Sequence, residues 1–205
     1  MTFSPIKYWE ERAKEYGERS VLNISLSEDE IRSLKEFQEK TIFPFLKKEL
    51  NGAEKTLLDF GCGPGRLSVE LADLTHCEVL GVDPIVYLLE LAPVKQNVSY
   101  KKIEKNIIPS GDNTFDIIWI SFVLGGIVNK NDLHQTLKEL NRVLKKNGLL
   151  FLIENTSEQK NSLYWKYYTK EYYTNLFRNL NLVHVHDFYH ANERFSIFTG
   201  RKNVA

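Results

Sequence analysis

The chain has 205 residues with 27 basic and 27 acidic side chains, and 42% of its residues are apolar. This composition predicts one folded domain with a small appendage, and the zero net charge argues against a nucleic-acid partner. Its two cysteines, Cys62 and Cys77, form neither a metal-binding nor a disulfide pattern. Because no apolar run is long enough to span a membrane, we expect a cytoplasmic protein without a membrane partner. We expect it to be a monomer or a homodimer.

Residues 1–50 are predicted to form a helical cap that stands apart from the rest of the chain. The spacing of apolar residues predicts a helix over 6–17 and a second helix that begins at the capping box Ser27–Glu30. Pro44 is expected to kink or end this second helix.

Residues 51–205 are predicted to form a domain in which short strands alternate with helices. Apolar runs predict seven strands, at 56–58, 79–82, 98–100, 115–120, 149–153, 182–188 and 194–199. Helical spacing predicts helices over 66–74 and 132–145, and a third after the cap residue Thr169. This order predicts an α/β fold: a doubly wound seven-stranded, mostly parallel sheet with an antiparallel C-terminal strand and helices on both faces.

The most informative stretch joins the first predicted strand to the next helix, and it reads DFGCGPGRL over residues 59–67. Its three alternate glycines let the backbone turn sharply and approach a ligand closely. A dinucleotide loop would carry a glycine in place of Arg66, and a P-loop would carry a lysine and then a hydroxyl after Gly65. Both of these patterns therefore fail.

The loop and three later motifs resemble the class I S-adenosylmethionine-dependent methyltransferases, from about residue 55 to the C-terminus. LLDFGCGPGR is similar to the first motif of that family and VLGVDP to the second. FDIIWISFVLGGI and LKELNRVLKKNGLLFLIEN are similar to its fourth strand and to the following helix and strand. The resemblance implies a Rossmann-like domain that binds S-adenosylmethionine (SAM) and methylates an O or N nucleophile of a small-molecule acceptor.

The same resemblance implies cofactor-binding residues at the ends of the first four strands. In the glycine loop they are Asp59, Gly61, Cys62, Gly63 and Gly65. Asp83 and Pro84 are expected in the cofactor site, where Asp83 accepts hydrogen bonds from the ribose hydroxyls, although Asp83-Pro84 also suits a helix cap. Glu104 stands where the family places an acid near the adenine amino group, but its lysine neighbours also suit a solvated surface. Ser121 is expected to line the methionine part of the cofactor, where a purely structural strand end is the alternative.

The N-terminal helix is expected to close over the acceptor as a lid. Tyr8, Arg12 and Tyr16 share one helical face, so Tyr8 and Arg12 are predicted to contact the cofactor and Tyr16 to act in catalysis. A helix that only packs against the domain is the alternative. The segment faintly resembles methyltransferases of surface glycans, which implies a sugar or a glycan precursor as acceptor.

Glu154, at the end of the fifth predicted strand, is the other catalytic candidate, as a base or as a group that positions the acceptor. The aromatic cluster between Tyr164 and Tyr168 suits a pocket wall or a packed core. His184 and His186 alternate on a strand expected at the sheet edge, and we predict no metal there. A methyltransferase-like binding module without catalysis remains the alternative function.

Overall fold

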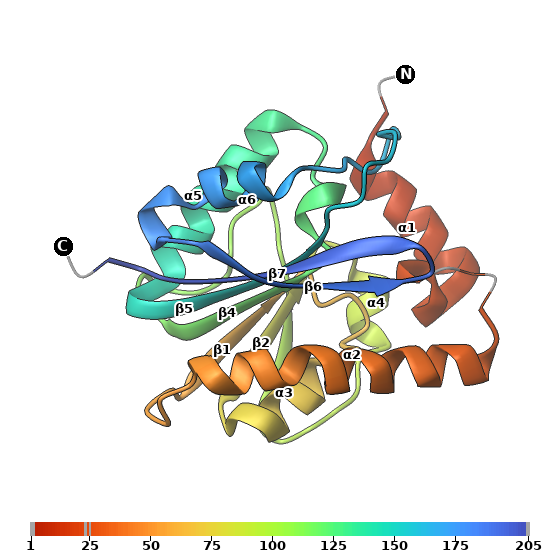
Figure 1. The fold of residues 1–205 in the computed structure, drawn as a ribbon. Helices are drawn as coiled ribbons and strands as arrows, with labels where there is room; N and C mark the ends of the chain where they lie inside the picture. The colour runs from red at the N-terminus through yellow and green to blue at the C-terminus, as the bar shows by residue number, and fades with distance from the viewer. Residues whose placement is uncertain (1–2, 23, 25, 204–205) are drawn as a thin grey trace.

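The computed structural model describes residues 3–22, 24 and 26–203. One seven-stranded sheet separates two layers of helices (Figure 1). The strands are β1 (Thr56–Phe60), β2 (Glu78–Asp83), β3 (Val98–Lys102), β4 (Phe115–Ser121), β5 (Leu144–Asn155), β6 (Val183–His190) and β7 (Glu193–Arg201). The helices are α1 (Pro5–Tyr16), α2 (Glu28–Glu49), α3 (Ser68–Thr75), α4 (Val86–Glu90), α5 (Lys130–Val143) and α6 (Lys170–Leu176).

The strand order is β3-β2-β1-β4-β5-β7-β6, and β7 is antiparallel to both of its neighbours while β1 to β5 pair in parallel. This confirms the predicted doubly wound sheet with an antiparallel C-terminal strand. Because the chain order reverses between β1 and β4, the connections of these two strands run to opposite sides and leave room at their carboxyl ends. β6, rather than the reversed β7, forms the edge.

Alternate residues of the central strands feed two separate cores. Leu57 faces one side, where it packs with Ile42 and Leu46 of α2, and its neighbour Leu58 faces the other, where it packs with Leu140 of α5. All five of these residues are at most 1% exposed. Two buried faces explain the continuous apolar runs at residues 117–120 of β4 and 149–153 of β5.

Two predicted boundaries differ from the structure. α2 continues past Pro44 to Glu49, because the buried residues Ile42 and Leu46 on either side hold it against the sheet despite the missing backbone donor. The helix predicted over 132–145 ends at Val143, and β5 begins at once with Leu144, which pairs with β4. The β5 pairing is non-local, so helical spacing could not reveal it.

Candidate functional site

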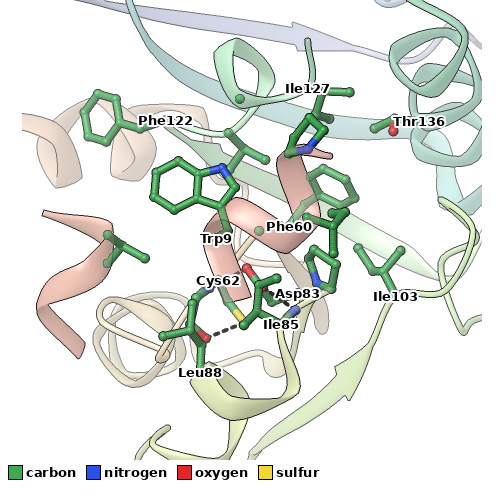
Figure 2. A pocket seen from close by; sticks show the side chains of 18 of the residues that line it. Trp9, Phe60, Cys62, Asp83, Ile85, Leu88, Ile103, Phe122, Ile127 and Thr136 are labelled. Carbon is green, nitrogen blue, oxygen red and sulfur yellow. Dashed lines mark hydrogen bonds between the residues drawn. The ribbon is translucent and has the colours of Figure 1, made fainter. Parts of the chain in front are cut away.

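A cavity of about 710 Å³ lies at the carboxyl ends of the parallel strands. Figure 2 shows side chains from β1, β2, the loop after β4 and α1 around it. Most of the predicted cofactor-binding residues line this cavity: Asp59, Gly61, Cys62, Gly63, Asp83, Pro84, Glu104 and Ser121. The predicted residues Gly65, Tyr8 and Arg12 lie outside this lining, and Gly65 instead lines a second cavity on the outer side of the loop.

The glycine loop turns where a side chain would not fit. Gly61 has a φ of 72°, and a Cβ atom there would lie 2.5 Å from the Cγ2 atom of Val123. Gly65 has a φ of 68°, and a Cβ atom there would lie 2.6 Å from the Tyr100 hydroxyl. Both left-handed turns therefore require glycine, and the loop backbone comes directly to the cavity.

Asp83 closes β2 and ties it to the glycine loop. Its Oδ2 atom accepts the Gly63 N–H at 3.0 Å, and its Oδ1 atom accepts the Ile85 N–H at 2.9 Å. Asp83 thus caps the turn into α4 and also lines the cavity, so the two predicted roles are compatible. Burial raises the pKa of the Asp83 carboxyl to about 6, against the backbone donors that lower it.

Asp59 places a second buried carboxylate in the same cavity. The Ser68 hydroxyl donates to its Oδ2 atom at 2.6 Å. Burial raises the pKa of Asp59 to about 7, and the nearby charge of Asp83 adds to that effect. Two carboxylates that line one cavity while they are less than 10% exposed suit a ligand that brings hydroxyl donors and positive charge.

The two ends of this part of the cavity differ in character. Glu104 lies at the β3 end, where its exposed carboxylate pairs with Lys102 at 3.1 Å. Ser121 lies at the other end, where β4 stops and Phe122 takes a left-handed φ of 59°. The glycine loop and the buried carboxylates Asp59 and Asp83 lie between these two ends.

α1 presents a different face to the cavity from the one that the sequence predicted. Trp9 lines the cavity together with Pro5, Ile6 and Glu10, whereas Tyr8, Arg12 and Tyr16 do not. The Arg12 guanidinium donates to the carbonyls of Ser20 at 2.6 Å and Leu22 at 3.1 Å, and it covers the Tyr16 ring. Arg12 therefore fastens the turn after α1.

Glu154 lies beneath the cavity wall and is outside the lining. Its Oε1 atom accepts the N–H groups of Val123 at 3.0 Å and Leu124 at 2.7 Å, and the Tyr173 hydroxyl donates to Oε2 at 3.3 Å. The residue is fully buried, and this burial raises the pKa of its carboxyl to about 7. These contacts make Glu154 the anchor of the loop after β4.

The aromatic cluster after β5 divides between wall and packing. Trp165 lines the cavity, and its ring packs against Gly125 and Gly126. A Cβ atom at Gly125 would lie 2.6 Å from this ring, and one at Gly126 would lie 3.4 Å from it. Tyr164 stacks on Tyr8 of α1. Tyr168 packs on the α5 side of the core and stacks on Tyr172. Trp165 thus fits the predicted pocket wall, whereas sequence reasoning missed Trp9, which lies in no motif.

The histidines of β6 have ordinary partners. His184 Nε2 lies 2.7 Å from Asp187 Oδ1, and the His186 ring stacks on Phe45. Hydrogen bonds from Ser196, Lys170 and His184 outweigh burial and lower the pKa of Asp187 to about 2. Over residues 3–22, 24 and 26–203, no three His, Cys, Asp or Glu side chains group as a metal site would need, and no helix is long and apolar enough to span a bilayer.

Comparisons with known proteins agree with this geometry. A family model described as a methyltransferase domain matches residues 58–152. A demethylmenaquinone methyltransferase of Staphylococcus saprophyticus is 33% identical over 159 residues, which cover 71% of this chain and 67% of the relative. The chain belongs to the class I SAM-dependent methyltransferases.

Solved structures agree on the fold of this methyltransferase. A SAM-dependent methyltransferase from Aquifex aeolicus superposes with a TM-score of 0.63 at 21% identity, over 85% of this chain and 98% of that one. A protein from Pyrococcus horikoshii superposes with a TM-score of 0.68 at 18% identity, over 94% and 99%. As a member of its family the methyltransferase uses SAM, which supplies a methyl group on a sulfonium centre, and its own residues must bind and orient the reactants.

Proposed function

We propose that this methyltransferase methylates a small acceptor that carries an apolar ring. The observation that carries the proposal is the composition of the cavity lining outside the glycine loop and the carboxylates. That part of the lining is largely apolar and comes from α1, the loop after β4 and the segment after β5: Ile6, Trp9, Phe122, Ile127, Val128 and Trp165. Apolar and aromatic walls favour a flat apolar molecule over a heavily hydroxylated one.

The similar staphylococcal proteins support a ring acceptor, because they are named demethylmenaquinone methyltransferases. A sugar or glycan precursor, as the sequence suggested, would need several polar side chains to pair with its hydroxyls. Glu10, Asn129 and Asp132 line the cavity as well, but most of the lining side chains from α1, the loop after β4 and the segment after β5 are apolar. We therefore favour the ring.

We propose that the predicted cofactor-binding residues that line the cavity bind SAM. Asp83 accepts the ribose hydroxyls, Glu104 lies on the adenine side, and the glycine loop passes close to the methionine part. Methyl transfer from a sulfonium needs alignment above all, so these residues raise the rate by fixing the donor in place.

We further propose that α1 acts as a lid together with the segment between β5 and α6. Trp9 of α1 forms one wall of the cavity, and Trp165 of the segment between β5 and α6 forms another. The closed lid excludes water from the reacting centre. Neither Tyr16 nor Glu154 lines the cavity, so proton removal by either is not part of this proposal. Glu10, on the cavity face of α1, is the carboxylate that the lid itself would bring to the acceptor.

Methyl transfer from labelled SAM tests the proposal directly. The acceptors are a short-tailed demethylmenaquinone kept reduced, and a nucleotide sugar. We expect label in the quinol and none in the sugar. Trp165→Ala should raise the KM for the quinol about tenfold, because an aromatic contact is lost, while affinity for S-adenosylhomocysteine (SAH) stays within about twofold. Tyr189→Ala, on an exposed ring of β6, is the control. Label in the sugar alone would overturn the proposal.

A further inference from the structure

The Tyr100 side chain reaches the back of the glycine loop from β3. A Cβ atom on Gly81 of β2 would lie 2.6 Å from the Cδ1 atom of the Tyr100 ring, and one on Gly65 of the loop would lie 2.6 Å from the Tyr100 hydroxyl. Because neither glycine carries a side chain, the tyrosine ring lies against both of them. The hydroxyl therefore ends beside the loop.

The Tyr100 hydroxyl is buried, but it makes no hydrogen bond to any residue that the structure describes. A buried hydroxyl without a partner costs free energy, and packing alone does not require it, since phenylalanine would fill the same space. Burial raises the pKa of Tyr100 to about 12, so the hydroxyl keeps its proton and remains a donor. The tyrosine therefore needs an acceptor close to the loop.

Ser68, the first residue of α3, is the acceptor that the geometry offers. Its side chain is completely buried, and its hydroxyl is close enough to Tyr100 to offset part of the rise in the tyrosine pKa. It donates to the Oδ2 atom of Asp59 at 2.6 Å. A serine hydroxyl has one proton to donate and two lone pairs that accept. Because Ser68 gives its proton to Asp59, it is free to accept one from Tyr100.

Within the described residues, three other titratable groups act on Asp59 or on the Tyr100 hydroxyl: Cys62 of the glycine loop, Glu70 of α3 and Asp83 of β2. Burial raises the pKa of the Cys62 thiol, which therefore stays neutral. Glu70 pairs with Lys35, and the Asp83 oxygens accept backbone N–H groups. Ser68 is thus the neighbour that connects the tyrosine to Asp59.

We propose that Tyr100 is a positioning residue of the cofactor site, whose hydroxyl donates to Ser68 while Ser68 donates to Asp59. Each hydrogen bond in such a chain strengthens the next, so the tyrosine holds the serine proton on the carboxylate. The chain favours the ionised form of Asp59, which lines the cavity. The inference rests on the proposed part of Asp59 in SAM binding and is independent of the acceptor.

Carbon-13 NMR of the aspartate carboxyls in ligand-free protein follows the Asp59 titration directly, with Asp59→Asn to assign the signal. Tyr100→Phe keeps the ring and removes the donor, so the midpoint of the Asp59 titration should move to higher pH. Ser68→Ala should move it further, since the direct donor is lost. Tyr87→Phe, on an exposed side chain of α4, is the control and should leave the midpoint unchanged.

A double variant tests whether Tyr100 acts through Ser68. In a Ser68→Ala protein, Tyr100→Phe should cause no further movement of the midpoint. Calorimetry with SAH gives a second readout. Tyr100→Phe should weaken SAH binding about threefold at pH 6 and leave it within about twofold at pH 9, where Asp59 is ionised in both proteins.

An unmoved midpoint in Tyr100→Phe would overturn the inference. Equal movement from Tyr100→Phe with and without the Ser68 hydroxyl would overturn it as well, because the tyrosine would then act by packing or directly on Asp59. A moved midpoint with unchanged SAH affinity at pH 6 would support the hydrogen-bonded chain and overturn the proposed part of Asp59 in SAM binding.

Discussion

The Tyr8 ring lies flat on the Tyr164 ring, with the ring centroids 4.3 Å apart and the planes 11° apart. Tyr8 belongs to α1 and Tyr164 to the segment between β5 and α6, so one contact joins two parts of the chain that are far apart in sequence. The next residue in each part, Trp9 and Trp165, lines the cavity. The stack therefore fixes the spacing of two cavity walls.

Removal of this stack is expected to loosen α1. Tyr164→Ala should cost about 0.5–1.5 kcal/mol of α1 docking, the usual value of an aromatic pair beyond its buried area. Hydrogen exchange of the α1 amides should become faster, while the amides of β1 and β4 keep their protection. Tyr164→Phe keeps the ring and should exchange as the unmodified protein does. Equal α1 exchange in all three proteins would contradict the role of the stack.

Two substitutions of Glu154 distinguish a structural role of this residue from a catalytic one. Glu154→Ala leaves the Val123 and Leu124 N–H groups without their acceptor, and the expected loss is about 2–5 kcal/mol of unfolding free energy. Glu154→Gln keeps an amide oxygen for the same donors and should retain most of the stability and the turnover number. A stable Glu154→Gln protein without activity would return Glu154 to the catalytic role predicted from the sequence.

Asp83 is expected to account for much of the ribose affinity. Asp83→Ala removes the acceptor of the ribose hydroxyls and should weaken SAH binding by about 1–3 kcal/mol in calorimetry. The same substitution frees the Gly63 and Ile85 N–H groups, so the melting temperature should fall as well. Asp73→Ala, on an exposed carboxylate of α3, controls for the loss of charge. An unchanged SAH affinity would leave Asp83 with the helix-cap role alone.

Cofactor affinity is expected to rise with pH. The pKa values of Asp83 and Asp59, about 6 and about 7, lie above their ordinary value of 3.8 because both are buried. Their contribution to the free energy of unfolding is therefore full at low pH, and it is lost as the pH rises through the pKa values of the folded protein. SAM brings an ammonium and hydroxyl donors that favour the ionised forms, so binding should release protons.

Calorimetry in two buffers of different ionisation enthalpy measures that release. SAM affinity should increase between about pH 5 and pH 8, the range that spans both carboxyl pKa values. In Asp59→Asn the increase should be smaller, because the Asp59 carboxyl no longer contributes to the proton release. An affinity that does not depend on pH over this range would show that neither carboxylate changes its protonation on binding.

The contact between Gly61 and Val123 sets a further expectation. Gly61→Ala should lower stability by about 2–4 kcal/mol, since the new methyl group meets Val123 and the φ of 72° strains an L-residue. Val123→Ala in the same protein should recover the part that comes from overlap. Gly52 has a φ of 83° and open space around it, so Gly52→Ala measures only the loss of stability that comes from the backbone conformation. Denaturant unfolding gives the three values.

Much of this molecule follows from local sequence because its motifs are continuous. Strand, glycine loop and helix lie within one short stretch, so Asp59 and Gly61 could be assigned to the cavity without coordinates. Asp83 ends the next strand, and parallel strands bring their carboxyl ends together. The sheet and much of the cavity lining at the strand ends could therefore be predicted from sequence pattern and family resemblance.

The acceptor side was out of reach for a different reason. Helical spacing groups Tyr8, Arg12 and Tyr16 on one face, but the rotation of a helix about its axis is decided by what it packs against, here α4 through Ala13. Glu154 finds its donors in a loop some 30 residues earlier in the chain. Its orientation depends on tertiary packing that no local pattern encodes.

The pairing of β7 has a practical consequence for how the protein is handled. Arg201, the last residue of β7, pairs with Leu149 in the middle of β5, away from Glu154 and the carboxyl end of that strand. Pro5, the first residue of α1, lines the cavity itself, and in Figure 1 the start of α1 and the end of β7 lie on opposite sides of the view. A purification tag or surface anchor attached beyond Arg201 leaves the entrance clear for ligands, whereas one attached ahead of Pro5 would crowd it.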